Sequence, residues 1–328
     1  FTFGVGYDVN TMLLDTLSHD HRGASAYVEP DENIEEEVSA FYSKVSSPLL
    51  SNVRLTMDGV KVDDLLPDPM PDLFAGSQLV LVGRYREGAR SDIILTGTVN
   101  GQTRTYTYRD IRFSSKGGDE SIPRLWATRK VGQLLKEIRL HGENKELIDS
   151  IVTLSIRYGI MTPYTSFLVD ESKDILTVTG REELAAKNFA PTMMPQTGSQ
   201  AVADSQTQTL LAEAERAGSD EAEIKQVGAK TFVLRDGIWM DTLYNPDTMR
   251  PEGVRFGSDA YYKLLSDRPE WGRYLAVGDR LVVVLDGTAY QIGPDQQDTV
   301  HLPDPPAPAP SSPWEQFWRW FLKVTGRS

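Results

Sequence analysis

The sequence contains no cysteine, and it has only four histidines. The chain therefore forms no disulfide and offers neither a thiol nucleophile nor a cysteine-ligated metal site. It also lacks any apolar run of about 18 residues, so a transmembrane helix of normal length is not predicted. Basic residues are outnumbered, 34 against 47 acidic ones, and the net charge of −13 argues against a nucleic-acid partner held through its phosphates.

What remains is the composition of an ordinary globular protein. The 328 residues are 40% hydrophobic and 25% charged, which leaves room for two or three domains. Because only four histidines are available and none stands in an evident Ser/His/Asp arrangement, a hydrolase triad is not predicted. We expect no catalytic residue and no metal ligand in this chain.

Residues 1–48 predict alternating strands and helices. Apolar runs at 1–5 and 24–28 are typical of strands, and amphipathic segments at 11–20 and 33–46 are typical of helices. This order implies two parallel strands joined by a helical crossover. Two strands and two helices cannot cover both faces and both edges of a doubly wound sheet. We therefore expect the chain to start inside a domain that an upstream segment or a separate chain completes.

Residues 49–115 predict an all-β region, most simply a β-sandwich. Short alternating stretches are separated by the turn dipeptides Asp58-Gly59 and Asn100-Gly101, which favour hairpins. A further strand is expected at 78–85. Three prolines, at positions 67, 69 and 71, exclude a helix between the first of these turns and that strand.

Residues 116–180 predict an αα-hairpin followed by a returning strand. Apolar residues recur at helical spacing over about 122–140 and 145–158, and Gly142 is suited to end the first helix. Trp126 and Tyr158 are expected to anchor this hairpin against the sandwich. The returning strand is predicted at 165–169.

The remaining third of the sequence predicts a linker, a small module and a tail. Residues 181–228 are expected to be mostly linker, with one short helix at 206–216, and residues 229–300 to form an α+β module with two hairpins and a helix near 258–265. A proline-rich spacer at 301–313 precedes an amphipathic helix at 314–328. Its apolar stripe predicts contact with a partner protein or with a membrane surface, without a transmembrane span. The stripe consists of Trp314, Phe317, Trp318 and Phe321.

Several polar motifs favour a structural role over a chemical one. Gly4 and Gly6 are better explained by a tight strand-to-helix turn than by a dinucleotide site, since the third glycine position holds Val9. The pair His19 and His21 has no partner cluster for a metal. His141 with Glu143 and Glu146 could act as an acid/base set, but solvated charges in a helix–helix loop are the simpler interpretation.

An acidic run could bind calcium weakly, but it is most simply the solvated first turn of a helix. The run consists of Glu32, Glu35, Glu36 and Glu37.

Two stretches in the helical region, Ile122–Lys130 and Arg157–Phe167, resemble the inter-alpha-trypsin inhibitor heavy-chain family. The form they resemble is the bacterial one, which contains a von Willebrand factor type A domain. Phe3–Gly6 and Arg22–Ala24 resemble the end of that type A domain. The resemblance covers roughly residues 1–170 and is most specific over residues 121–169.

The resemblance implies a fold class and a mode of action. Residues 1–48 would be the C-terminal part of a doubly wound type A domain, followed by the sandwich with its αα-hairpin. Such proteins are secreted or attached to the cell envelope and bind other macromolecules, here proteins or extracellular matrix-like polymers. Mg²⁺ or Ca²⁺ would be held by loops upstream of Phe1, so this chain itself would carry no cofactor. The Asp-Pro-His-Phe sequence through which vertebrate members are linked to a glycan is absent.

Two classes of function remain open from the sequence. The first is a non-enzymatic binding or adhesion protein. The second is a hydrolase or a peptidase-associated subunit whose active site lies upstream of Phe1. A D-x-S-x-S motif in upstream sequence would favour the first, and a catalytic signature there would favour the second.

Overall fold

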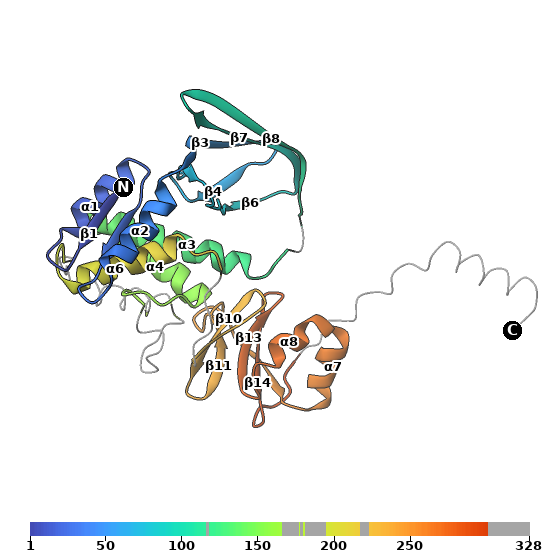
Figure 1. The fold of residues 1–328 in the computed structure, drawn as a ribbon. Helices are drawn as coiled ribbons and strands as arrows, with labels where there is room; N and C mark the ends of the chain where they lie inside the picture. The colour runs from blue at the N-terminus through green and yellow to red at the C-terminus, as the bar shows by residue number, and fades with distance from the viewer. Residues whose placement is uncertain (116–117, 166–176, 178–179, 181–194, 217–222, 301–328) are drawn as a thin grey trace, which may run out of the picture. The chain divides into compact units, whose positions relative to one another are not determined.

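The computed structural model describes residues 1–115, 118–165, 177, 180, 195–216 and 223–300. The chain divides into two compact units, Phe1–Thr248 and Met249–Ser328, and both mix helices with sheets (Figure 1). The predicted returning strand, the proline-rich spacer and the tail helix fall wholly or mostly outside the described residues. Trp314, Phe317, Trp318 and Phe321 lie there as well.

The first unit opens with the predicted β-α-β-α order. Strand β1 (Thr2–Val5) pairs in parallel with β2 (Ser25–Val28), and the register runs from Thr2 opposite Ser25 to Val5 opposite Val28. Helices α1 (Thr11–Asp20) and α2 (Ile34–Val45) begin after Asn10 and Asn33, whose side chains accept hydrogen bonds from backbone amides of the first turn. The parallel pairing is confirmed. The apolar run at 1–5 also predicts a strand buried on both faces, and this is not what the structure shows, because Phe1 and Val5 are about half exposed.

The β-rich region consists of two sheets. A four-stranded sheet has the order β5-β3-β7-β8, and β4 pairs with β6 in a second sheet. All neighbours are antiparallel. The strands are β3 (Pro48–Asp58), β4 (Val62–Leu66), β5 (Leu73–Phe74), β6 (Val82–Tyr85), β7 (Ala89–Val99) and β8 (Gln102–Phe113).

Of the two predicted hairpin turns, only Asn100-Gly101 joins paired strands. Both residues have positive φ, and Val99 pairs with Gln102 across the turn. Asp58-Gly59 does turn the chain, with Gly59 at a φ of +97°, but β3 pairs with β5 and β7 instead of the strand that follows it. A turn dipeptide specifies a local reversal, whereas pairing depends on which distant strand covers the apolar side chains. The strand predicted at 78–85 is shorter than expected and starts only at Val82.

The αα-hairpin is confirmed as α3 (Ile122–His141) and α4 (Lys145–Tyr158), which pack against each other. Gly142 and Gly159 follow the two helices with positive φ. Trp126 is buried, and its Nε1 donates to the carbonyl oxygen of Asp64 at 3.2 Å, as expected for an anchor against the β region. Tyr158 is half-buried and lies under the guanidinium of Arg157.

The sequence predicts mostly linker over residues 181–228, with one short helix at 206–216. The structure instead contains helix α6 (Ser199–Ala212), which begins earlier and ends earlier than that prediction. It packs along α3 and buries Ala201, Val202 and Ser205. These residues are small or polar, so the segment lacks the apolar periodicity that identifies a helix. Their small size is what allows the two helix backbones to approach, and the packing is recognisable only in three dimensions.

The first unit ends with three antiparallel strands, β9 (Ile224–Val227), β10 (Lys230–Arg235) and β11 (Ile238–Asp241). In the second unit, β14 (Thr288–Gly293) pairs with β13 (Leu281–Leu285) and, in parallel, with β12 (Glu252–Arg255). In the sequence, β12 and β13 are separated by helix α7 (Asp259–Asp267), the 3₁₀ turn η2 (Pro269–Trp271) and helix α8 (Gly272–Leu275). Both predicted hairpins and the helix near 258–265 are confirmed.

Candidate functional site

Helix α1 turns a polar stripe toward the protein and leaves two of its three leucines exposed, while Leu14 is half-buried beside Gly4. Thr11, Asp15 and Ser18 are buried, whereas Leu13 and Leu17 are exposed. The usual rule for a surface helix places the apolar stripe inward. The orientation of α1 is the reverse of this rule. Two questions follow: what stabilises the buried polar side chains, and what covers the exposed leucines.

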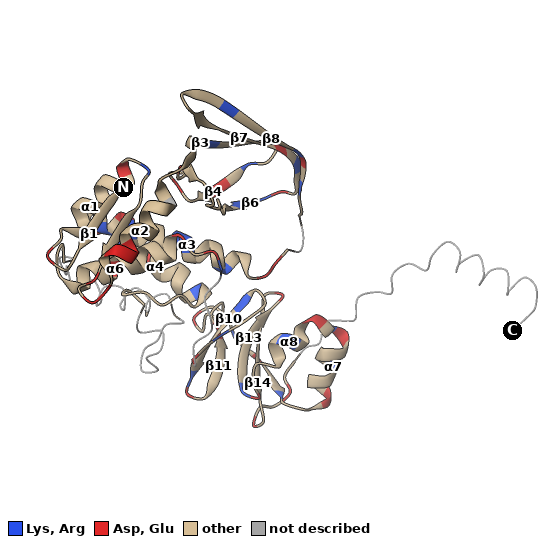
Figure 2. Ribbon diagram, viewed as in Figure 1, with Lys and Arg blue, Asp and Glu red and all other residues tan. Residues whose placement is uncertain are grey.

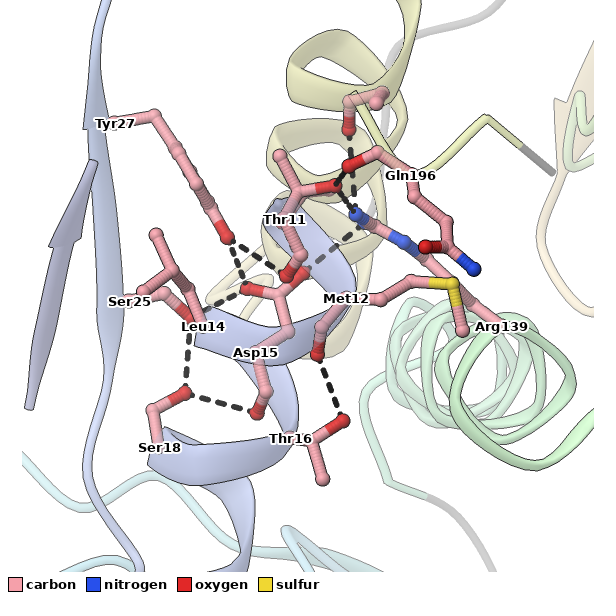
Figure 3. A network of polar contacts seen from close by, with 12 residues as sticks. Thr11, Met12, Leu14, Asp15, Thr16, Ser18, Ser25, Tyr27, Arg139 and Gln196 are labelled. Carbon is pink, nitrogen blue, oxygen red and sulfur yellow. Dashed lines mark hydrogen bonds and ion pairs between the residues drawn. The ribbon is translucent and has the colours of Figure 1, made fainter. Parts of the chain in front are cut away.

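The buried polar groups form a network around the carboxylate of Asp15 (Figure 3). Its Oδ1 accepts hydrogen bonds from Ser25 Oγ at 2.6 Å and from the Tyr27 hydroxyl at 2.7 Å. Its Oδ2 accepts one from Ser205 Oγ at 2.7 Å and lies 3.1 Å from Arg139 Nη1. The carboxylate therefore accepts three side-chain hydrogen bonds and has one cationic partner. The four donors come from β2, α6 and α3.

Arg139 holds the opposite side of the network. Its Nη2 donates to Thr11 Oγ1 and to the Ala201 carbonyl oxygen, the latter at 3.4 Å. Thr11 Oγ1 in turn donates to the Gln196 carbonyl oxygen at 3.1 Å. Burial and the hydrogen bond to Asp15 raise the pKa of the Tyr27 phenol, so this group stays protonated as a donor. The network thus ties α1 and β2 to α3 and α6.

A cavity of about 640 Å³ lies next to this network. Its walls come from the end of α1, the β4–β6 connection with its three prolines, one side of α3 and the end of α6. On the α3 side it is lined by Arg129, Gln133 and Lys136. The volume falls in the range of small-molecule sites, roughly 300–1,000 Å³.

The cationic groups of this cavity differ in how they are paired. Arg129 donates Nε to the Ala214 carbonyl oxygen and Nη1 to that of Val80, both at 2.6 Å. His19 has its pKa lowered by burial and by Lys136, so its imidazole is neutral at pH 7. Burial, aided by Arg139, also lowers the pKa of Lys136, against the opposing effects of Asp15 and Glu213.

The polar motifs singled out from the sequence do not assemble into a chemical site. His141 Nδ1 lies 3.2 Å from Glu137, while Glu143 accepts a hydrogen bond from the Tyr164 hydroxyl at 3.2 Å. His141 is therefore not placed in an acid/base set with Glu143 and Glu146. Within the described part of the chain, no three His, Asp or Glu side chains are grouped as metal ligands would be. Nor does that part contain a helix with the length and apolar character needed to cross a bilayer.

The glycine pair and the acidic run have local structural roles. A Cβ on Gly4 would lie 2.8 Å from the Tyr27 ring, and Gly6 has a φ of +75°, as a tight turn requires. Glu35, Glu36 and Glu37 stand in the first turn of α2 (Figure 2), where carboxylates favour the helix dipole. Glu32 accepts a hydrogen bond from the backbone amide of Glu29.

A second apolar stripe is exposed on α2, at Ile34, Val38 and Tyr42. Its spacing of four residues places these side chains on one face of the helix. Leu13 and Leu17 of α1 and Phe1 and Val5 at β1 are exposed as well, and we call all of these exposed residues the open apolar face. They lie on both sides of β1, because Gly4 lies against Leu14 of α1 whereas Phe1 and Phe3 contact Phe41 of α2. The sequence contained this signal, but the polar side of α1 was not recognised as its buried side.

Comparison with known proteins finds relatives among the inter-alpha-trypsin inhibitor heavy chains, although no family model matches the chain. The chain is 28% identical over 183 residues to inter-alpha-trypsin inhibitor heavy chain H2 of Sus scrofa. This match covers 52% of the present chain and 20% of the relative. It is 29% identical over 187 residues to heavy chain H3 of Mus musculus, covering 53% and 21%. Heavy chain H4 of Homo sapiens is 27% identical over 188 residues, covering 53% and 20%.

These matches support the resemblance drawn from the sequence. They extend over half of this chain, whereas the chain spans only about a fifth of the length of the curated relatives it matches.

Proposed function

We propose that this chain is a segment of a secreted or cell-envelope binding protein of the inter-alpha-trypsin inhibitor heavy-chain type. It acts without catalysis, through contacts with proteins or extracellular matrix-like polymers. The similarity to heavy chains H2, H3 and H4 supports the family, and the bacterial form of that family is part of the proposal.

The observation that carries the proposal is the inverted orientation of α1. Its polar stripe is fixed inward by Asp15 and Arg139, so its leucines cannot rotate into the core of this chain. Covering Leu13 and Leu17 would remove apolar surface from water at about 25 cal/mol per Å². We propose that further strands and helices of a type A domain cover this open apolar face, supplied by an upstream segment or a separate chain.

Single-cysteine labelling tests this assembly cleanly because the sequence has no cysteine of its own. Leu13→Cys and Tyr42→Cys should react readily with a maleimide in the 328-residue chain, since both positions are exposed. In the longer natural protein, both should become protected. Leu210→Cys is the matched control, an exposed leucine on α6 whose labelling should stay unchanged. Equal labelling of Cys at position 13 in both proteins would contradict the proposal.

We further propose that any Mg²⁺ or Ca²⁺ used in binding is held by residues outside this chain. Calorimetry should therefore detect no micromolar Mg²⁺ or Ca²⁺ binding to the 328-residue chain. Binding of the longer protein to an immobilised protein or polymer partner would then be compared in Mg²⁺ and in EDTA. Micromolar binding of either cation to the chain alone would overturn this part of the proposal.

The tail is proposed to provide a second contact, with a partner protein or with a membrane surface. The sequence places Trp314, Phe317, Trp318 and Phe321 at helical spacing, with Arg319 and Lys323 nearby. Deleting residues 314–328 should weaken self-association or surface attachment and leave the melting temperature of the rest unchanged. Sedimentation and liposome flotation that are identical with and without the tail would remove this contact from the proposal.

A further inference from the structure

The cavity beside α3 contains one cation without a partner. Among the described residues, no hydrogen bond or ion pair engages Lys136 Nζ, although the side chain lines the cavity and is half-buried. Lys130, less than two turns earlier on the same helix, pairs with Asp64 at 3.1 Å and does not line the cavity. The contrast shows that the free ammonium group is specific to the cavity.

The other basic groups that line the cavity are Arg22, Arg129 and His19. Arg22 donates Nη1 to Asn52 Oδ1 at 3.5 Å. Arg129 is held by backbone carbonyl groups, so its guanidinium is fixed in the wall. His19 is neutral at pH 7 because its pKa is lowered, chiefly by burial. A charge that is partly removed from water and left unpaired recovers free energy when an opposite charge binds to it. Lys136 is the cationic group of this cavity that makes no hydrogen bond or ion pair with the described residues, so it is the group to which we assign an anionic ligand.

The residues that line the cavity determine what polarity and what charge a ligand should have. Leu66, Leu79 and Leu140 line the cavity together with three prolines, so most of the surface offered is apolar. Exposed carboxylates of Asp68, Glu213 and Glu215 also line it and would repel a multiply charged anion. A single negative charge on an apolar body satisfies both conditions.

We propose that this cavity binds a small amphipathic monocarboxylate, with the carboxylate at Lys136 Nζ and the apolar body against the leucine and proline walls. The geometry combines a cavity of about 640 Å³, an unpaired cation and apolar walls. This is the pattern of a small-molecule site, in which few polar groups orient a largely apolar ligand. The proposal concerns this chain alone, and of the open apolar face only Phe1 lines the cavity.

Calorimetry with decanoate, decanol and inorganic phosphate tests the proposal on the full 328-residue chain. Decanoate should bind with a micromolar dissociation constant and decanol at least about tenfold more weakly, because a charge-assisted hydrogen bond is lost. Phosphate should not bind measurably. Lys136→Met should weaken decanoate by about tenfold or more and leave decanol unchanged. Lys136→Arg should retain most of the decanoate affinity, and Lys130→Met should retain all of it.

The proposal fails if the unaltered chain does not bind decanoate below its micelle concentration, or if Lys136→Met binds it as tightly as the unaltered chain. A thermal melt of each variant shows whether it is folded. If Lys136→Met does not fold, acetylation of the unaltered chain replaces it. Decanoate should then protect Lys136 from acetic anhydride, as measured by mass spectrometry, and leave Lys130 reactive. Equal modification of Lys136 with and without decanoate would also overturn the proposal.

Discussion

At the scale of single residues, the ion pair of Asp15 and Arg139 places two charges in the interior of the first unit. Both side chains are almost completely removed from solvent. Burying a charge is costly unless a partner and further hydrogen bonds compensate it, and here Ser25, Tyr27 and Ser205 supply those bonds. The pair therefore fixes which segments meet, and it contributes specificity more than net stability.

Arg139→Met should lower the free energy of unfolding by about 3–5 kcal/mol, because it leaves the Asp15 carboxylate buried without its cation. Adding Asp15→Asn to that variant should recover part of the loss. Urea titration measures both. Lys145→Met, which removes an exposed pair with Asp149, is the control and should change little. Asp15→Asn alone completes the cycle, and if the double variant loses as much as the two single variants together, the two residues are not coupled.

Trp126 fills a different role, as the anchor of α3 on the β region. It is buried, donates Nε1 to the Asp64 carbonyl oxygen, and carries the guanidinium of Arg84 5.0 Å from its ring centre. Trp126→Ala should destabilise the first unit by about 3–5 kcal/mol, as large-to-small core substitutions do. Thermal melts compare it with Tyr262→Ala, which alters an exposed ring. A melting temperature unchanged by Trp126→Ala would refute the anchoring role.

At the scale of elements, α3 is the central helix of the first unit. It contacts α1, α4, α6 and the β4–β6 sheet, and it contributes both Arg139 and the α3 wall of the cavity. It approaches α6 closely at Gly132. A Cβ placed there would lie 2.3 Å from the Ala212 backbone nitrogen and 2.7 Å from the Leu211 carbonyl carbon. Because these are backbone atoms, the helices would have to separate.

Gly132→Ala should therefore destabilise the fold by about 1–3 kcal/mol, the usual cost of overpacking, despite the better helix propensity of alanine. Gly272→Ala is a matched control, since it is also helical and its added Cβ would meet only Leu265 Cδ2 at 3.4 Å. We expect that control to be neutral or slightly stabilising. Urea titrations should therefore show a loss of stability for Gly132→Ala and none for Gly272→Ala. A neutral result for Gly132→Ala would show that α6 is not packed on α3 as closely as described.

At the scale of the whole molecule, the open apolar face makes a prediction about association. Leu13→Gln with Val38→Gln should lower the fluorescence of a bound apolar dye and reduce self-association of the 328-residue chain. Stability should be preserved, because both side chains are exposed. Analytical ultracentrifugation and a thermal melt check the two parts. A lower melting temperature would mean that these residues pack within the chain.

Much of the fold follows from the sequence alone. The bounds of α1 and α2, the αα-hairpin at Gly142 and the turns at Asn100-Gly101 and Asp236-Gly237 arise from caps, periodicity and positive-φ residues. These signals are local, so they can be recognised within a few residues. The resemblance to the heavy chains was likewise carried by contiguous stretches.

The tertiary structure decided everything that depends on residues far apart in the sequence. Asp15 is separated from Arg139 by more than 100 residues and from Ser205 by 190, so no spacing rule could join them. Helix α6 was not recognised because its buried side is small and polar, and β3 pairs with β7 across a long connection. The cavity at Lys136 is likewise assembled from segments that lie far apart in the sequence, from Phe1 to Glu215. Local propensity fixes each element, whereas burial of charge and close packing decide which elements meet.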